Sequence, residues 1–313
     1  MQRLTGHTRG IRAVAFAVDG HLVSGGEDRT VRVWDPASGE TVAVIAARRI
    51  VYALAVSPDG RSVAFGGRPR GATGVPNVLT LAMLPDGGRS RDLRTGQTDS
   101  SIWSVSYSHD GEHLTIAFRR PSPGNHSNGA GGHWWKSGDS ANADGLDDTA
   151  PYAVAGVLDD TAAYAVAFHP TAATFAFTTR SAVRVFHQFR GAELRQYKLP
   201  TNWAVALAFV PNRTTLIVAA DRLVYHADTA TDTRFKKVRT GIPHIKSLAV
   251  SPDGRSLYVS GRPGRIERYS LPKFESVAAF DFEIGNVDAV AVSPDSLTVA
   301  AGGERGLVVF DAE

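Results

Sequence analysis

The feature that most constrains this chain is an internal repeat of about 40 residues. Seven short segments share an apolar-rich run that leads into a turn. Their turns begin at Ala17, Ser57, Ser108, His169, Val210, Ser251 and Ser293. The successive spacings are 40, 51, 61, 41, 41 and 42 residues. A period this regular, with two insertions, predicts one supersecondary unit repeated along all 313 residues.

Each unit has the sequence signals of four strands. The first run, such as IRAVAF or IKSLAV, is rich in β-branched and aromatic residues and lacks the i, i+3, i+4 stripe of a helix. A turn such as SPDG follows, and then come a second strand (HLVSGG), a third (VRVWD) and a weaker fourth (TVAVIAA). Four strands repeated at this period are typical of a β-propeller. We therefore expect an all-β chain in which residues 1–313 form a single seven-bladed β-propeller of four-stranded antiparallel blades.

The first repeat carries the most specific motif of the chain. Residues 6–35, GHTRGIRAVAFAVDGHLVSGGEDRTVRVWD, open with Gly-His and close with Trp-Asp, and they resemble a blade of the WD-repeat family. The resemblance implies a buried, hydrogen-bonded structural tetrad that consists of His7, Ser24, Asp28 and Trp34. The other six repeats depart from this pattern, with Phe186, Tyr269 or Phe310 where the Trp would lie.

The two ends of the chain are expected to meet in one blade. The last repeat stops after its third strand in residues 307–313, LVVFDAE, while residues 2–4 precede the first Gly-His, where a fourth strand belongs. Pairing of these two segments would remove an exposed sheet edge. The N-terminal segment is short for this role, so the chain can also be part of a larger protein.

Composition excludes several classes of protein. The chain has no Cys, which excludes disulfides, thiolate catalysis and Cys-ligated zinc. No stretch approaches the ~20 apolar residues of a membrane span, and MQRLTGHTRG lacks the apolar core of a secretion signal, so we expect a cytoplasmic protein. Arg outnumbers Lys by 28 to 6, a bias typical of a high-GC, bacterial genome. The net charge of +3 does not by itself indicate nucleic-acid binding.

Two insertions interrupt the period, at about residues 68–77 in the second repeat and 121–150 in the third. The family resemblance implies that second-to-third strand connections lie on one face of the disc, the top, around the channel mouth. We expect GGRPRGATGVPN and PSPGNHSNGAGG to project from this face, HWWKSG to form the third strand of blade 3, and DSANADGLDDTAP to lie on the opposite face. Two adjacent blades lengthen the same connection, which favours a functional role.

Candidate binding residues gather near these connections. Arginines recur there and predict a basic ring that includes Arg68, Arg70, Arg119, Arg120, Arg180, Arg222, Arg262 and Arg305. The forked guanidinium group matches carboxylates and phosphates, which indicates an acidic partner. The arginine-rich genome and nearby carboxylates such as Glu27 and Glu304 explain the same pattern without function. The other candidates on this face are His126, His133, His244 and Trp135.

Two further tryptophans, Trp103 and Trp203, lie near the starts of first strands. They either flank the top opening or pack between blades, and we favour packing. An aromatic side chain in the opening would be a suitable anchor for a partner.

Three functions fit these residues. We prefer a non-catalytic, monomeric scaffold or sensor module that binds an acidic peptide or protein segment on its top face, without metal or cofactor. The alternative is an enzyme of lyase or hydrolase type that acts on a small anionic substrate, with His126, His133 or His244 as general base. Nucleic-acid binding is the third function, and the lack of a clear basic and aromatic track counts against it.

Overall fold

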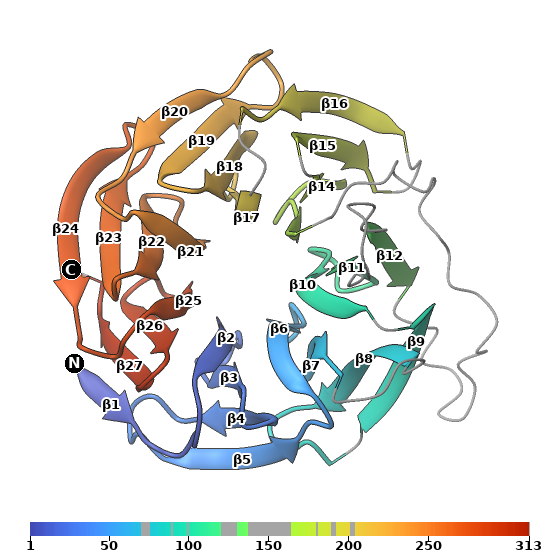
Figure 1. Ribbon diagram of the computed structural model, residues 1–313, viewed down its shortest axis with the longest axis vertical. Coiled ribbons are helices and arrows are strands. Elements are labelled where there is room, and N and C mark those ends of the chain that lie inside the picture. The colour runs from blue at the N-terminus through green and yellow to red at the C-terminus, as the bar shows by residue number, and fades with distance from the viewer. Residues whose placement is uncertain are drawn as a thin grey trace, which may run out of the picture.

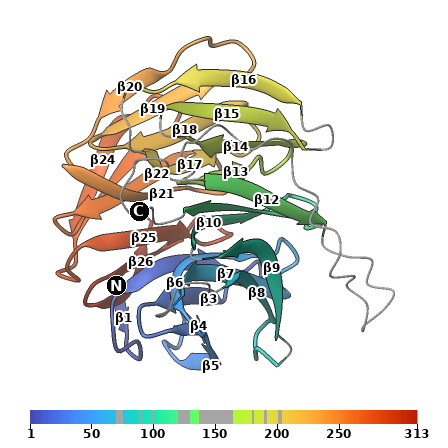
Figure 2. The ribbon, with the colours of Figure 1, turned by 45° about the vertical axis from the view of Figure 1, so that its right-hand side comes forward.

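Antiparallel strands make up the regular secondary structure of the described residues. The computed structural model describes residues 1–69, 76–88, 90–98, 100–119, 130–136, 164–179, 181–188, 192–200 and 204–312. They form seven sheets that follow one another around a common axis (Figure 1 and Figure 2), so the predicted all-β propeller is confirmed. Six sheets contain four strands, and the sheet of the third repeat contains three within the described residues. No helix long and apolar enough to cross a membrane occurs among these residues.

The strands of the first four sheets follow the order of the chain, from the axis outward. Blade 1 contains β2 (Ile11–Phe16), β3 (Leu22–Gly26), β4 (Thr30–Trp34) and β5 (Thr41–Ala46). Blade 2 contains β6 (Ile50–Val56), β7 (Ser62–Arg68), β8 (Pro76–Met83) and β9 (Ser90–Thr98). Blade 3 contains β10 (Ser101–Tyr107), β11 (His113–Arg119) and β12 (Ala130–Lys136). Blade 4 contains β13 (Val166–Phe168), β14 (Thr174–Thr178), β15 (Ala182–His187) and β16 (Glu193–Lys198).

The remaining three sheets repeat this arrangement, and the last one also takes a strand from the start of the chain. Blade 5 contains β17 (Ala204–Phe209), β18 (Thr215–Ala220), β19 (Leu223–Asp228) and β20 (Lys236–Arg239). Blade 6 contains β21 (His244–Val250), β22 (Ser256–Arg262), β23 (Arg265–Ser270) and β24 (Glu275–Asp281). Blade 7 contains β25 (Val287–Val292), β26 (Thr298–Gly303), β27 (Gly306–Asp311) and β1 (Gln2–Leu4).

The turn after an inner strand is held by its own side chains. In blade 6, Ser251 Oγ donates to Asp253 Oδ1 at 2.5 Å and accepts the backbone N–H of Ser256 at 2.9 Å. Gly254 has a φ of 69°, a conformation that favours glycine. The same contact between serine and aspartate recurs in the turns that begin at Ser57, Ser108 and Ser293. Because these contacts are local, the sequence SPDG specifies the turn by itself.

The apolar core lies between neighbouring blades. Ile11 and Trp34 of blade 1 belong to one buried cluster with Ala300 and Leu307 of blade 7. Gly302 on β26 lets the two blades approach, because a Cβ atom there would lie 2.5 Å from Ile11 Cγ2. The small residue on the second strand and the branched residue on the next inner strand therefore determine the spacing between blades.

Strand β1 is the outer strand of the sheet that the last repeat builds (Figure 1). It pairs with β27 in an antiparallel register in which Gln2 lies opposite Val309 and Leu4 opposite Leu307. Leu4 is buried in the cluster that joins blades 7 and 1. Residues from both ends of the chain thus contribute to one blade.

Blade 3 differs from the predicted strands. The third strand was expected at HWWKSG, residues 133–138, but β12 begins at Ala130 and ends at Lys136. The shift arises because β11 continues to Arg119, whose backbone pairs with Ala130. The ladder therefore includes glycines that were expected to lie in a loop. The rest of the predicted insertion, residues 121–129 and 137–150, lies outside the described residues. In blade 2, β7 ends at Arg68 and β8 begins at Pro76, and residues 70–75 of the predicted insertion lie outside the described residues.

Candidate binding site at the axial rim

The structure brings together all four residues of the predicted tetrad in blade 1. Trp34 Nε1 donates to Ser24 Oγ at 2.8 Å, Ser24 Oγ lies 2.8 Å from His7 Nε2, and His7 Nδ1 lies 2.8 Å from Asp28 Oδ2. Burial lowers the pKa of His7 despite the nearby Asp28, so the ring is neutral near pH 7. Asp28 loses solvation, yet the hydrogen bonds from His7 and the Thr8 backbone lower the pKa of its carboxyl group.

These protonation states fix the direction in which hydrogen bonds are donated along the tetrad. An ionised Asp28 can only accept, so His7 donates from Nδ1 and accepts at Nε2 from the Ser24 hydroxyl, which itself accepts from Trp34. Every member is satisfied, and the network joins the segment before β2 to β3 and β4. Its role is therefore structural, and it leaves no group for a ligand.

Blade 6 replaces this tetrad with a buried carboxylate that the sequence analysis missed. Tyr269, in the position of the tryptophan, donates from its hydroxyl to Glu267 Oε2 at 2.6 Å. The backbone N–H of Gly241 donates to the same oxygen at 2.9 Å, and Arg265 Nε lies 3.1 Å from Glu267 Oε1. Burial, reinforced by Glu267, raises the pKa of the Tyr269 hydroxyl. This group also links strands and has no free member.

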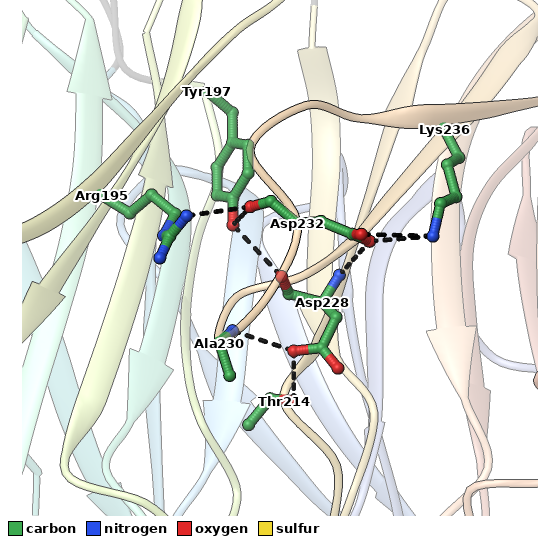
Figure 3. Close-up of polar contacts among 7 residues, drawn as sticks. All are labelled: Arg195, Tyr197, Thr214, Asp228, Ala230, Asp232 and Lys236. Carbon is green, nitrogen blue, oxygen red and sulfur yellow. Dashed lines mark hydrogen bonds and ion pairs between the residues drawn. The ribbon is translucent and has the colours of Figure 1, made fainter.

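A second polar cluster lies at the far end of blade 5, where β19 leads into β20 (Figure 3). Asp228 Oδ1 accepts from the Thr214 hydroxyl at 2.6 Å and from the backbone of Ala230 at 2.9 Å. Asp232 accepts from the backbone N–H of Asp228 at 3.0 Å and pairs with Lys236 at 3.1 Å. Both carboxylates are therefore occupied by the turn that they shape.

Contacts from blade 4 attach this turn to its neighbour. Tyr197 Oη and Arg195 Nη1, both on β16, donate to the backbone carbonyl of Asp232 at 3.2 and 3.0 Å (Figure 3). The cluster is thus a link between blades 4 and 5 and not a ligand site.

A third cluster contains three side chains of the kind that bind metal ions, Asp110, Glu112 and His113, with ligand atoms within 4.8 Å of one another. Gln188 of blade 4 reaches into it, because its Nε2 lies 2.8 Å from His113 Nδ1 and 3.5 Å from Asp110 Oδ2. The Gln188 amide therefore occupies the position from which a metal ion would contact both groups. We interpret this cluster as a link between blades 3 and 4.

The side chains available for binding lie at one end of the inner strands. In six of these strands the register shifts by one residue near the first pair, which is a β-bulge. The bulged residues are Arg12, Tyr52, Trp103, Val205, Lys246 and Asp288. Tyr164 has the equivalent sequence position in blade 4. A bulge frees a residue from the ladder and re-aims its side chain, so we call these six bulged residues the axial rim, whereas Tyr164 packs against the buried cluster that contains Val166 and Phe168.

One half of the rim is charged. Arg12 Nη1 donates to Asp288 Oδ2 at 2.8 Å, and Arg12 Nε donates to Glu27 Oε1 at 2.8 Å. The Asp288 side chain is only 7% exposed, and burial raises its pKa although Arg12 and Lys246 oppose this shift. Arg12 is thus held by two carboxylates, while the Lys246 ammonium has no hydrogen-bond acceptor among the described residues.

The other half of the rim is aromatic. The rings of Tyr52 and Trp103, from adjacent blades, stack with centroids 5.1 Å apart and planes inclined by 24°. Trp103 was expected to pack between blades, but it is 42% exposed, because the bulge directs it away from the inter-blade core. Trp203 lies outside the described residues.

The predicted arginines that the structure describes lie at this same end. Arg68 and Arg262 pair with Ile50 and His244, the first residues of their inner strands. Arg222 and Arg305 lie in the turns that connect β18 to β19 and β26 to β27. All four are exposed, and no acceptor contacts their guanidinium groups within the described part of the chain.

The other predicted residues are only partly described or not described. His244 is exposed at the start of β21, and its Nδ1 lies 3.8 Å from Asp221 Oδ1. The backbones of Arg119, His133 and Trp135 lie in β11 and β12, and nothing is described of their side chains. The predicted candidates that lie outside the described residues are Arg70, Arg120, His126 and Arg180.

Sequence reasoning missed most of the rim, although a signal is present. The signal is the second position of the repeats IRAVAF, VYALAV, IWSVSY, AVALAF, IKSLAV and VDAVAV. This position differs from repeat to repeat, whereas the positions on either side of it remain apolar or small. This position contains Arg, Tyr, Trp, Val, Lys and Asp. A column that varies while its neighbours stay apolar indicates side chains outside the core.

Comparison with known proteins supports a WD-repeat propeller. Residues 1–35 match the WD40 family, described as WD domain, G-beta repeat. The chain is also similar to the nuclear distribution protein nudF of Emericella nidulans, with 35% identity over 77 residues. That match covers 23% of this chain and 17% of the relative, and the relative's fungal origin gives no support to the predicted bacterial source. The chain is therefore an all-β propeller whose first blade is similar to a WD40 repeat.

Proposed function

We propose that this chain is a non-catalytic protein-interaction module that binds an acidic peptide or protein segment on the face that carries the axial rim. The WD40 match of residues 1–35 supports a general role as a protein-interaction scaffold. The face itself supports the acidic partner, because its cations include several that no carboxylate of the described chain contacts.

The observation that carries the proposal is the contrast between Arg12 and the outer arginines. Arg12 is held by Glu27 and Asp288, so its donors are used within the protein. Arg222 and Arg262, on the adjacent blades 5 and 6, are exposed and contact no acceptor among the described residues, and Arg305 on blade 7 is in the same state. Their guanidinium groups can each receive a carboxylate in a forked geometry.

The electrostatics also predict how binding responds to salt. Exposed charges interact through water, so an attraction between this face and an acidic segment weakens as ionic strength rises. The predicted residues of the blade 2 and blade 3 connections, Arg70, Arg120 and His126, belong to the same proposal and would extend the surface beyond blades 5 to 7.

A charge-reversal experiment tests the proposal. We expect the triple variant Arg222→Glu, Arg262→Glu and Arg305→Glu to weaken binding of a fluorescent Glu-rich peptide by about tenfold or more, measured by fluorescence anisotropy at low salt. The wild-type affinity should fall between about 50 and about 300 mM salt.

The matched control reverses three arginines at the other end of the inner strands. The turns after β6, β17 and β21 contain the exposed residues Arg61, Arg213 and Arg255. Their replacement by Glu changes the net charge equally but leaves the rim face intact. If both triple variants weaken binding to the same extent, the attraction is a property of net charge and the proposed face is wrong.

A further inference from the structure

The aromatic half of the rim is a candidate binding surface in its own right. We call Tyr52 and Trp103, the bulged residues of the adjacent blades 2 and 3, the aromatic arc. Trp103 is the one aromatic residue among the large apolar side chains that are exposed in the described residues. Tyr52 stacks against Trp103, so the indole of Trp103 is oriented by a neighbouring ring and is not free to fold back onto the core.

The charges beside the arc determine which side chains fit. Between Tyr52 and Asp288 in the rim lies Arg12, whose two carboxylate partners use its donors. Across the axis, Lys246 and Arg262 influence the buried Asp288 but contact no acceptor in the part of the chain that the structure describes. The exposed Glu304, which accepts a hydrogen bond from Asn286, also lies near Arg262. Lys246 and Arg262 are nevertheless cations that no carboxylate of the described residues contacts, so they can attract an anionic side chain.

We propose that the rim recognises one aromatic side chain within an acidic peptide: the ring stacks on Trp103, and neighbouring carboxylates bind Lys246 and Arg262. This inference rests on the proposed function and deepens it by naming the residue type that the partner inserts. A ring that stacks on an oriented indole at the centre of a surface is the usual form of an interaction hot spot. One exposed ring accommodates one side chain, whereas single-stranded nucleic acid requires a row of stacking platforms along a cationic track.

Selection from a random nonapeptide display library tests this inference without knowledge of the natural partner. The wild-type chain should enrich peptides that contain Asp or Glu together with one Trp, Tyr or Phe. The Trp103→Ala variant should enrich acidic peptides that lack the aromatic residue. The Trp103→Phe variant keeps a ring and should restore the preference for peptides with an aromatic residue. The matched control is Leu297→Ala, which removes an exposed apolar side chain from the turn after β25 and should select the same peptides as the wild type.

The affinities of one selected peptide for the wild type and the variants give a quantitative test of the inference. Binding to Trp103→Ala should be about tenfold weaker than binding to the wild type, and the same loss should follow when the peptide's aromatic residue is replaced by Ser. Lys246→Ala should weaken binding of both the aromatic and the Ser peptide, because it acts through the carboxylates. Circular dichroism of each variant verifies that the sheets are retained.

The possible outcomes separate the two proposals. Acidic peptides without an aromatic preference, together with an unchanged Trp103→Ala variant, would overturn this inference and leave the proposed function in place. Enrichment of basic or neutral peptides would overturn both. Tighter, Trp103-dependent binding of a labelled oligothymidine than of any selected peptide would assign the arc to nucleic acid and also overturn the inference.

Discussion

Ser24 shows how much a single hydroxyl group contributes in this fold. It accepts the indole N–H of Trp34 and donates to the neutral ring of His7, so two buried groups depend on one atom. Ser260, on the second strand of blade 6, is equally buried, with 0% of its surface exposed, but its Oγ has no partner in the described structure. Comparison of the two serines therefore distinguishes the contribution of burial to stability from the contribution of a satisfied hydrogen bond.

We expect Ser24→Ala to lower the free energy of unfolding by about 1–3 kcal/mol, because it leaves the donor of Trp34 and the acceptor of His7 unsatisfied. Ser260→Ala should leave stability unchanged or raise it slightly, since it removes a buried hydroxyl without a partner. Chemical denaturation of both variants measures the difference. Equal destabilisation would show that the tetrad contributes no more than ordinary packing.

At the scale of elements, the outer strand of blade 7 depends on a segment of three residues. Strand β1 makes its contact with the core through Leu4, which is 4% exposed and packs with Ile11 and Trp34. Most outer strands in this structure are largely exposed, and Val42 on β5, for example, is 45% exposed. Leu4 is thus the residue through which a short strand is held to the propeller.

Leu4→Ala should destabilise the protein by about 2–4 kcal/mol, because it opens a cavity between blades 7 and 1 and weakens the pairing of β1 with β27. Val42→Ala, on an outer strand as well, should change stability by about 0.5 kcal/mol or less. Thermal unfolding followed by circular dichroism compares the two. A Leu4→Ala variant as stable as Val42→Ala would mean that β1 does not contribute to the folded blade.

At the scale of the whole molecule, three histidines in different blades titrate in the same direction. Burial lowers the pKa of His7, His169 and His226 from the ordinary value of 6.5. Each binds its proton more weakly in the folded chain than in the unfolded chain. Between pH 6.5 and the lower folded values the unfolded state binds more protons, so stability is complete above this window and falls as pH falls through it.

Stability should therefore be lower at pH 5.5 than at pH 7.5, as measured by urea denaturation. His226→Leu should reduce this difference, because it removes one of the three groups while keeping an apolar contact with Phe274, on which His226 stacks at 4.0 Å. Val42→Ala, at an exposed position, changes no titratable group, so it serves as the control and should keep the difference. A pH dependence that is identical in the wild type and His226→Leu would contradict the assignment.

The sequence by itself determined the repeated unit and its turns. Ser251, Asp253 and Gly254 show why, since their hydrogen bonds and positive φ involve only residues within one turn. The runs rich in β-branched and aromatic residues likewise predicted the strands, and local chemistry was sufficient for both. The tetrad of His7 and Trp34 was implied by the resemblance of residues 6–35 to a WD-repeat blade.

The rim was decided by the tertiary structure. Arg12 was not among the predicted arginines, and the folded chain places it against Asp288, which is 276 residues away, so its charge is paired within the protein. Trp103 looked like a core residue because an apolar sequence does not reveal a bulge, which exists only when two strands pair. The sequence thus determined what each blade is, whereas the side chains that face a partner depend on contacts between blades.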